Sequence, residues 1–127
     1  MPLVRISVPN GQPAEYLGAV SDGVHQALVE IFKIPADDLF HIITEHAPGI
    51  RLVRPRSYLG IEYSDDVMVI QITANDTRTI EQKRALYKVI VDRLTKSPGV
   101  RPQDIVINLI EVKKENWSFG NGEAQYA

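Results

Sequence analysis

The chain is 127 residues long, a length typical of one folded domain, so we expect residues 1–127 to form a single domain. Its hydrophobic content of 44 % and charged content of 24 % are ordinary for a globular protein, and no apolar run reaches the length of a membrane span. The net charge of −2 argues against a nucleic acid as the main partner, because phosphate binding depends on a surplus of Lys and Arg. The absence of cysteine excludes disulfides, thiolate metal sites and cysteine nucleophiles.

The first half of the chain predicts a strand, a helix and a second strand. Its opening MPLVRISV lacks the charged and apolar regions of a signal peptide, so we expect a cytoplasmic location and no membrane partner. Residues 3–8 alternate imperfectly between apolar and polar side chains and end at a Pro-Asn-Gly turn, which predicts a strand. Apolar residues recur at helical spacing over residues 13–33, where Pro13 suits a first helical turn. Residues 39–44 are apolar and β-branched and predict a buried strand.

The second half repeats this order. Residues 67–73 predict a strand, and Thr79 with Gln82 has the form of a capping box that opens a helix. The Ser-Pro-Gly sequence at 97–99 ends that helix, and residues 105–110 predict the fourth strand.

One offset of 66 residues relates the two halves. It separates three pairs of landmarks: Pro13 and Thr79, Asp38 and Asp104, and Glu45 and Glu111. We therefore expect duplicated β-α-β units over about residues 2–46 and 67–112, followed by a C-terminal tail over residues 113–127. Two such units can join into an α/β (α+β) fold, a four-stranded mixed sheet with two helices on one face. The first strands of the two halves then run antiparallel, which brings Pro2 near residues 75–78.

The alternative architecture is a ferredoxin-like binding module, which has a similar number of elements. That fold links its halves tightly, whereas here about twenty residues, 47–66, separate them. Residues 57–63 of this linker suggest a short hairpin. The linker also carries Arg51, Arg54 and Arg56, which indicate a solvated basic loop, with carboxylate binding as the alternative.

Pro2 becomes a secondary amine at the N-terminus if Met1 is removed, and removal is favoured before a small residue such as Pro. An α-amino group titrates near 7.7–8.0, and burial or a nearby cation lowers that pKa. A carboxylate such as Asp38 favours the ammonium instead. The amine could thus serve as a base, as an acid, or as a nucleophile that forms an iminium with a carbonyl. The alternative is that the Met-Pro start is only a processing signal.

The start with Pro, the duplicated halves and the tail sequence NWSFGNGEAQY together resemble the tautomerase superfamily, and within it the malonate semialdehyde decarboxylase group. The segment at residues 34–38 is similar to the segment that carries the group's catalytic Asp, and residues 78–83 are similar to its Arg-bearing helix start. The resemblance spans nearly the whole chain. It implies a homotrimeric enzyme, a lyase or an isomerase, that acts on a small carboxylate-bearing oxo acid without a cofactor.

Carried over by position, the resemblance implies Pro2 as the catalytic amine, Asp38 as its carboxylate partner and Arg78 as the cation that holds the substrate carboxylate. A planar guanidinium at a helix N-terminus suits that anion. Trp117 and Phe119, together with Tyr126, would form an apolar wall. His25, His41 and His46 show no metal-ligand spacing, so we assign them no chemistry and expect no metal.

One departure concerns the substrate. The group's pattern has Arg-Pro-Arg before the second helix, whereas this chain has Asn-Asp-Thr-Arg at residues 75–78. Asp76 would repel an anionic substrate if it faced the pocket, and Arg54 or Arg56 are candidates to compensate. The first hypothesis is decarboxylation of malonate semialdehyde or a related 3-oxo acid, with hydration of acetylenic or halogenated acrylates as a side activity. The alternatives are keto–enol tautomerisation of a 2-oxo acid such as phenylpyruvate, and a non-catalytic trimeric binding protein.

Overall fold

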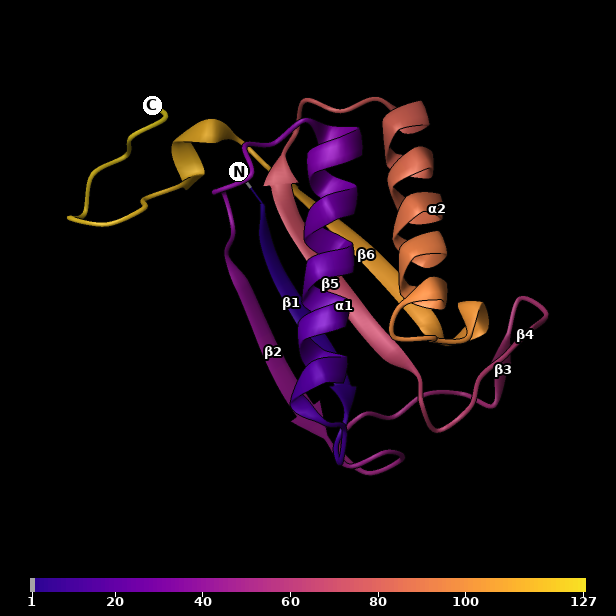
Figure 1. The fold of residues 1–127 in the computed structure, drawn as a ribbon. Helices are drawn as coiled ribbons and strands as arrows, with labels where there is room; N and C mark the ends of the chain where they lie inside the picture. Colours follow the sequence, from indigo (N-terminus) through magenta and orange to yellow (C-terminus); the bar gives the residue numbers. More distant parts are fainter. Residues whose placement is uncertain (1) are drawn as a thin grey trace.

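The computed structural model describes residues 2–127, and Met1, whose removal the catalytic hypothesis requires, lies outside the described residues. The two halves each contain a strand, a helix and a strand (Figure 1). The first half comprises β1 (Leu3–Pro9), α1 (Ala14–Ala27), η1 (Leu28–Phe32) and β2 (His41–His46). A small hairpin, β3 (Ser57–Tyr58) and β4 (Ile61–Glu62), follows. The second half comprises β5 (Met68–Asn75), α2 (Ile80–Lys96), η2 (Pro102–Asp104), β6 (Ile105–Val112) and η3 (Lys114–Asn116).

The main sheet has the strand order β2-β1-β5-β6. Strand β1 pairs with β2 in parallel, β5 pairs with β6 in parallel, and the two first strands β1 and β5 pair antiparallel at the centre. Both helices cover the same face of this sheet (Figure 1). The predicted duplicated β-α-β architecture with a mixed sheet is therefore confirmed.

Alternation along the central strands explains the packing. In β1 the buried residues Val4, Ile6 and Val8 point to the helices, and in β5 every second residue from Met68 to Ala74 does so. The helices meet them with apolar residues at helical spacing. These residues form one core, completed from the helices by Val20, Val24, Ala27, Leu28, Leu86, Ile90 and Leu94. Within residues 2–127, no helix covers the opposite face of the sheet (Figure 1).

The helix ends follow local chemistry. The capping box at the start of α2 is confirmed, since the Thr79 side chain accepts from the Gln82 amide and the Gln82 side chain accepts from the Thr79 amide. The predicted first helix differs at its end, because residues 28–32 form a π-helical turn that closes at Lys33 with a φ of 58°. Apolar spacing alone does not distinguish a π turn from an α turn. Neither helix in the described part of the chain is long and apolar enough to span a membrane.

The prediction of a buried strand over residues 39–44 was wrong in two respects. The strand begins at His41, and Leu39 and Phe40 before it are 50 % and 49 % exposed. Ile42 is also exposed. The reason is that β2 lies at the edge of the sheet, where apolar side chains that do not face the helices stay partly exposed.

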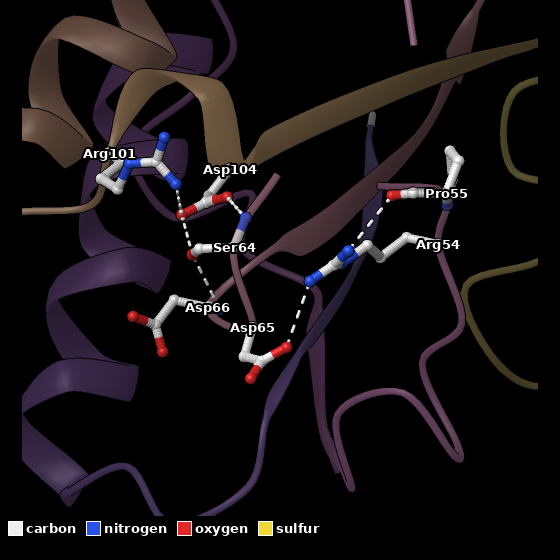
Figure 2. Close-up of polar contacts among 7 residues, drawn as sticks. All are labelled: Arg54, Pro55, Ser64, Asp65, Asp66, Arg101 and Asp104. Atoms are coloured by element: carbon white, nitrogen blue, oxygen red, sulfur yellow. Dashed lines mark hydrogen bonds and ion pairs between the residues drawn. The ribbon is translucent and has the colours of Figure 1, made fainter. Parts of the chain in front are cut away.

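The linker packs against the end of the sheet away from Pro2. The predicted hairpin is confirmed as β3 and β4, joined by Leu59 and Gly60 with φ of 52° and 79°. Figure 2 shows how the linker is fixed: the buried Asp104 carboxylate accepts from the amide and hydroxyl of Ser64 and from Arg101. Asp104, the repeat partner of Asp38, thus has a structural role at the entry of β6.

Candidate active site

Pro2 is buried and directly precedes β1. Leu3 lies opposite Thr73 of β5, so continuing this antiparallel register by one residue brings Pro2 beside Ala74. Val4 lies beside His41 of β2, and continuing this parallel register by two residues brings Pro2 beside Leu39. The N-terminus therefore lies between the end of β5 and the loop before β2, as the repeat geometry predicts, and Figure 1 shows the C-terminal tail at the same end of the sheet.

Asp38 lies in the loop that connects η1 to β2, one residue before the register neighbour of Pro2. The loop is shaped by tight turns, in which the Asp38 amide donates to the Pro35 carbonyl at 3.1 Å and the Leu39 amide donates to the Asp37 carbonyl at 3.0 Å. Asp38 is partly buried, and its carboxylate lies close enough to Arg78 to interact electrostatically with that guanidinium.

Arg78 links the two halves at this end of the sheet. Its Nη2 donates to the Phe32 carbonyl at 3.1 Å, and its guanidinium carbon lies 4.6 Å from the centre of the Phe32 ring. Burial lowers the pKa of Arg78, and Asp38 partly offsets this effect. The residue immediately precedes Thr79, the N-cap of α2, so its charge adds to the positive end of the helix dipole. Together these features suit a site for a carboxylate.

The C-terminal tail forms a cluster of aromatic rings. Trp117 and Phe119 stack with ring centres 5.7 Å apart, and Phe119 meets Tyr126 edge to face at 4.9 Å. The ring of Phe40, from the Asp38 loop, lies 6.5 Å from that of Phe119. The Trp117 indole donates to the side-chain oxygen of the buried Asn75 at 2.8 Å. The tail is thereby attached both to the end of β5 and to the loop before β2.

A second contact folds the tail back on itself. The side-chain oxygen of Gln125 accepts from the Phe119 amide at 2.9 Å, and its nitrogen donates to the Gly120 carbonyl at 3.0 Å. This pair of hydrogen bonds closes the loop between Phe119 and Gln125 and holds Tyr126 against the aromatic cluster.

The linker arginines do not join this group within one chain. Arg54 donates to Asp65 at 3.1 Å (Figure 2). It also lines a small cavity with Pro9, at the far end of β1 from Pro2. A strand of this length separates its ends by roughly 20 Å, so Arg54 lies far from Pro2 of the same chain. Arg56 is exposed at the base of the hairpin, where its carbonyl accepts from the Tyr63 amide.

Asp76 also faces solvent, and its backbone amide donates to the Val112 carbonyl at 3.0 Å. The concern that Asp76 repels an anionic substrate is therefore reduced by its exposure, which lets water screen the charge. The described residues contain no group of three or more His, Asp or Glu side chains placed to hold a metal ion.

Sequence reasoning missed three residues that shape the site: Phe32, Phe40 and Asn75. Their contacts join segments far apart in the chain, so local periodicity does not reveal them. One signal was present for Asn75, because a polar residue at the end of a largely buried strand needs a hydrogen-bond partner where it is itself buried.

Comparison with known families identifies the class of this protein. A family model described as tautomerase enzyme matches residues 37–120, and a second model with the same description matches residues 2–57. The chain belongs to the tautomerase family of enzymes.

Individual relatives cover the full length. The chain is 38 % identical over 125 residues to the probable tautomerase YusQ of Bacillus subtilis (strain 168), with 98 % of each chain covered. It is 30 % identical over 126 residues to the probable tautomerase YrdN of the same organism, covering 99 % of this chain and 96 % of the relative. Among solved structures it is similar to FG41 malonate semialdehyde decarboxylase inhibited by 3-bromopropiolate, at 37 % identity and a TM-score of 0.90, covering 98 % of this chain and 93 % of that chain.

Proposed function

We propose that this protein is a cofactor-free decarboxylase of malonate semialdehyde or a related short 3-oxo acid, in which the amino group of Pro2 is the reactive group. The observation that carries this proposal is the position of Pro2, buried between the loop of Asp38 and the end of β5, with Arg78 beside Asp38. The 37 % identity to a malonate semialdehyde decarboxylase supports the same reaction class.

The proposed reaction needs only these side chains. Arg78 holds the substrate carboxylate, and the aromatic wall of Trp117 and Phe119 leaves that charge poorly solvated, which promotes its loss. Asp38 favours the protonated form of Pro2, which donates a hydrogen bond to the aldehyde oxygen. The bond between the carboxylate and the adjacent carbon breaks, its electron pair forms the enolate, and carbon dioxide leaves. The Pro2 ammonium stabilises the enolate oxygen by this hydrogen bond and then transfers its proton to the enolate carbon to give acetaldehyde, and solvent returns a proton to Pro2.

The second candidate is keto–enol tautomerisation of a 2-oxo acid such as phenylpyruvate, favoured by the two Bacillus relatives described as probable tautomerases. In that reaction neutral Pro2 removes a proton from one atom of the substrate and returns it to another. The pKa of Pro2 distinguishes the candidates. A pKa above neutrality favours the decarboxylase, and a pKa below neutrality favours the tautomerase.

We further propose that the chain assembles as a homotrimer. The sheet face without helices borders a groove beside the hairpin, lined by Tyr58, Tyr63, Val67, Val69 and Val106. Leu59 at the hairpin tip is 83 % exposed and adopts a left-handed backbone, a position where Asn would be preferred. Leu59 is exposed and apolar in a backbone conformation that costs it energy, and a contact with a neighbouring subunit would explain both features.

The test compares turnover of malonate semialdehyde with turnover of phenylpyruvate by the purified protein, by its Pro2→Ala variant and by its Asp38→Asn variant. We expect release of acetaldehyde and carbon dioxide by the wild type and a loss of at least about 100-fold in both variants. Faster turnover of phenylpyruvate would support the second candidate. Full activity of the Pro2→Ala variant would exclude both, and binding of an oxo acid without turnover would indicate a non-catalytic binding protein.

A further inference from the structure

A buried histidine connects helix α1 to the loop that carries Asp38. His25 lies in the last turn of α1 and is 7 % exposed. Its Nε2 lies 2.8 Å from the carbonyl oxygen of Ala36, two residues before Asp38. A carbonyl oxygen only accepts hydrogen bonds, so Nε2 must carry the hydrogen and donate it. This contact joins the helix layer directly to the loop beside Pro2.

The loop depends on few fixed points. It begins at the buried Ile34 and ends where the Phe40 carbonyl accepts from the Val4 amide at 2.9 Å. Between these points the backbone has no regular structure, and the residues around Ala36 are exposed. The hydrogen bond from His25 is therefore a long-range anchor in the middle of the loop.

Core packing alone does not explain a histidine at this position. Its Nδ1 is buried and has no hydrogen-bond partner within the described residues. A buried polar atom without a partner lowers stability, and a leucine would fill similar space without that cost. A leucine could not donate the hydrogen bond that His25 donates to the Ala36 carbonyl.

The neighbouring His41 holds the ring in place. The rings of His25 and His41 meet edge to face with centres 6.0 Å apart, and the His41 Nδ1 lies 2.8 Å from the Ser21 hydroxyl. Burial first and His25 second lower the pKa of His41 to about 4, with Asp22 acting in the opposite direction. His41 is therefore neutral near pH 7 and packs against His25 without an opposing charge.

We propose that His25 is a positioning residue, which holds the Ala36 carbonyl so that the carboxylate of Asp38 faces the Pro2 amine. His25 touches neither the substrate nor the reacting atoms and acts only through Asp38. The inference rests on the proposed function in taking Asp38 as the partner of Pro2.

The test measures the pKa of the Pro2 amine by NMR in protein that lacks Met1, so it needs no turnover. A nearby carboxylate raises this pKa, and Asp38→Asn should lower it. We expect His25→Leu, which removes the donor, to lower it by about half a unit or more. His25→Gln, whose side-chain amide can reach the same carbonyl, should keep the wild-type value. In the Asp38→Asn background, His25→Leu should have no further effect.

Three results would overturn the proposal: an unchanged Pro2 pKa in His25→Leu, an equal decrease in the Asp38→Asn background, or an unchanged pKa in Asp38→Asn itself. His25→Met provides a second donor-free variant if His25→Leu does not fold. The matched control is Val20→Ala, a cavity in the same helix, which should lower the melting temperature without moving the Pro2 pKa.

Activity gives an independent readout. If the proposed reaction occurs, His25→Leu should lower kcat about tenfold with KM within about twofold, because the carboxylate acts on Pro2 and does not bind substrate. Absence of turnover with every oxo acid would refute the proposed function, while the Pro2 titration would still decide the role of His25.

Discussion

At the scale of single residues, Arg78 has a structural role and a proposed chemical one. Its guanidinium contacts the carbonyl and ring of Phe32, immediately before the Asp38 loop, and we propose that its charge also binds a substrate carboxylate. Lysine keeps the charge but lacks both the planar fork and the face that stacks on the ring. The two roles can therefore be separated by substitution.

We predict that Arg78→Met lowers kcat/KM for the oxo-acid substrate by about 100-fold or more, since removing a partly buried charge partner costs about 2–5 kcal/mol. Arg78→Lys should retain part of the charge interaction and fall between Met and wild type. Steady-state kinetics measure both variants. Equal kcat/KM in wild type and Arg78→Met would show that Arg78 does not bind the substrate.

His41 makes a separate prediction about stability and pH. Its folded-state pKa of about 4 lies below its ordinary value of 6.5, so between these values the unfolded chain binds a proton that the folded chain does not. Stability should fall as the pH falls through this window. The loss in unfolding free energy should be on the order of 1–2 kcal/mol. This is less than the full pKa shift would imply, because the His41 ring is only partly buried.

Urea unfolding at pH 7 and at about pH 4.5 measures this effect. The matched variant His41→Asn has no titrating ring and can still hydrogen-bond to Ser21. It should lose less stability than wild type between the two pH values. Equal losses in the two proteins would mean that His41 is not the source.

The roles of single residues could be predicted only where a short sequence motif indicated them. The resemblance assigned Pro2, Asp38 and Arg78 from short motifs, and their roles remain proposals. His25 shows why other roles were missed. Its spacing to His41 and His46 carries no metal pattern, and its contact with Ala36 depends on how the loop folds back over the helix.

At the scale of elements, two glycines of α1 differ in their surroundings. A Cβ placed on Gly23 would lie 2.7 Å from Leu94 Cδ2, whereas one on Gly18 would meet nothing within 4 Å. Leu94 is fully buried in α2, so its side chain has little room to move. Gly23 therefore sets how closely the two helices pack.

We predict opposite effects for the two alanine variants. Gly18→Ala should stabilise the protein by about 0.5–1 kcal/mol through helix propensity. Gly23→Ala should destabilise it by about 1–2 kcal/mol, because overpacking outweighs the same propensity gain. Thermal or urea unfolding of the pair measures the difference, and a stabilised Gly23→Ala would show that the helices can separate freely.

Elements with a strong period were predicted well, and weakly constrained ones were not. Strand β5 and helix α2 have clear alternation or capping signals, and both lie near their expected bounds. The apolar run at residues 39–44 was predicted to be a buried strand, but Leu39 and Phe40 lie outside the core and are half exposed. The ring of Phe40 instead packs against that of Phe119 in the tail. Sequence periodicity shows that one face of a helix or strand is apolar, but it does not show which other element covers that face.

At the scale of the whole molecule, the uncovered sheet face and the hairpin bear on assembly. Leu59→Asn should suit the left-handed turn better and leave the fold of the hairpin intact. It should also weaken the proposed trimer by removing an exposed apolar contact. Native mass spectrometry across a dilution series measures the assembly, with Lys88→Asn on the solvent face of α2 as control. A trimer equally stable in Leu59→Asn and wild type would place the interface elsewhere.

The central claim is that the Pro2 nitrogen is the reactive group, and peptide mass spectrometry of the N-terminus tests it directly. The protein is incubated with 3-bromopropiolate, a small electrophilic carboxylate named as the inhibitor in the FG41 decarboxylase structure. We predict that Met1 is absent, that the N-terminal peptide carries the adduct on Pro2, and that Arg78→Met slows its formation. Retained Met1, or an inhibited protein with unmodified Pro2, would contradict the account.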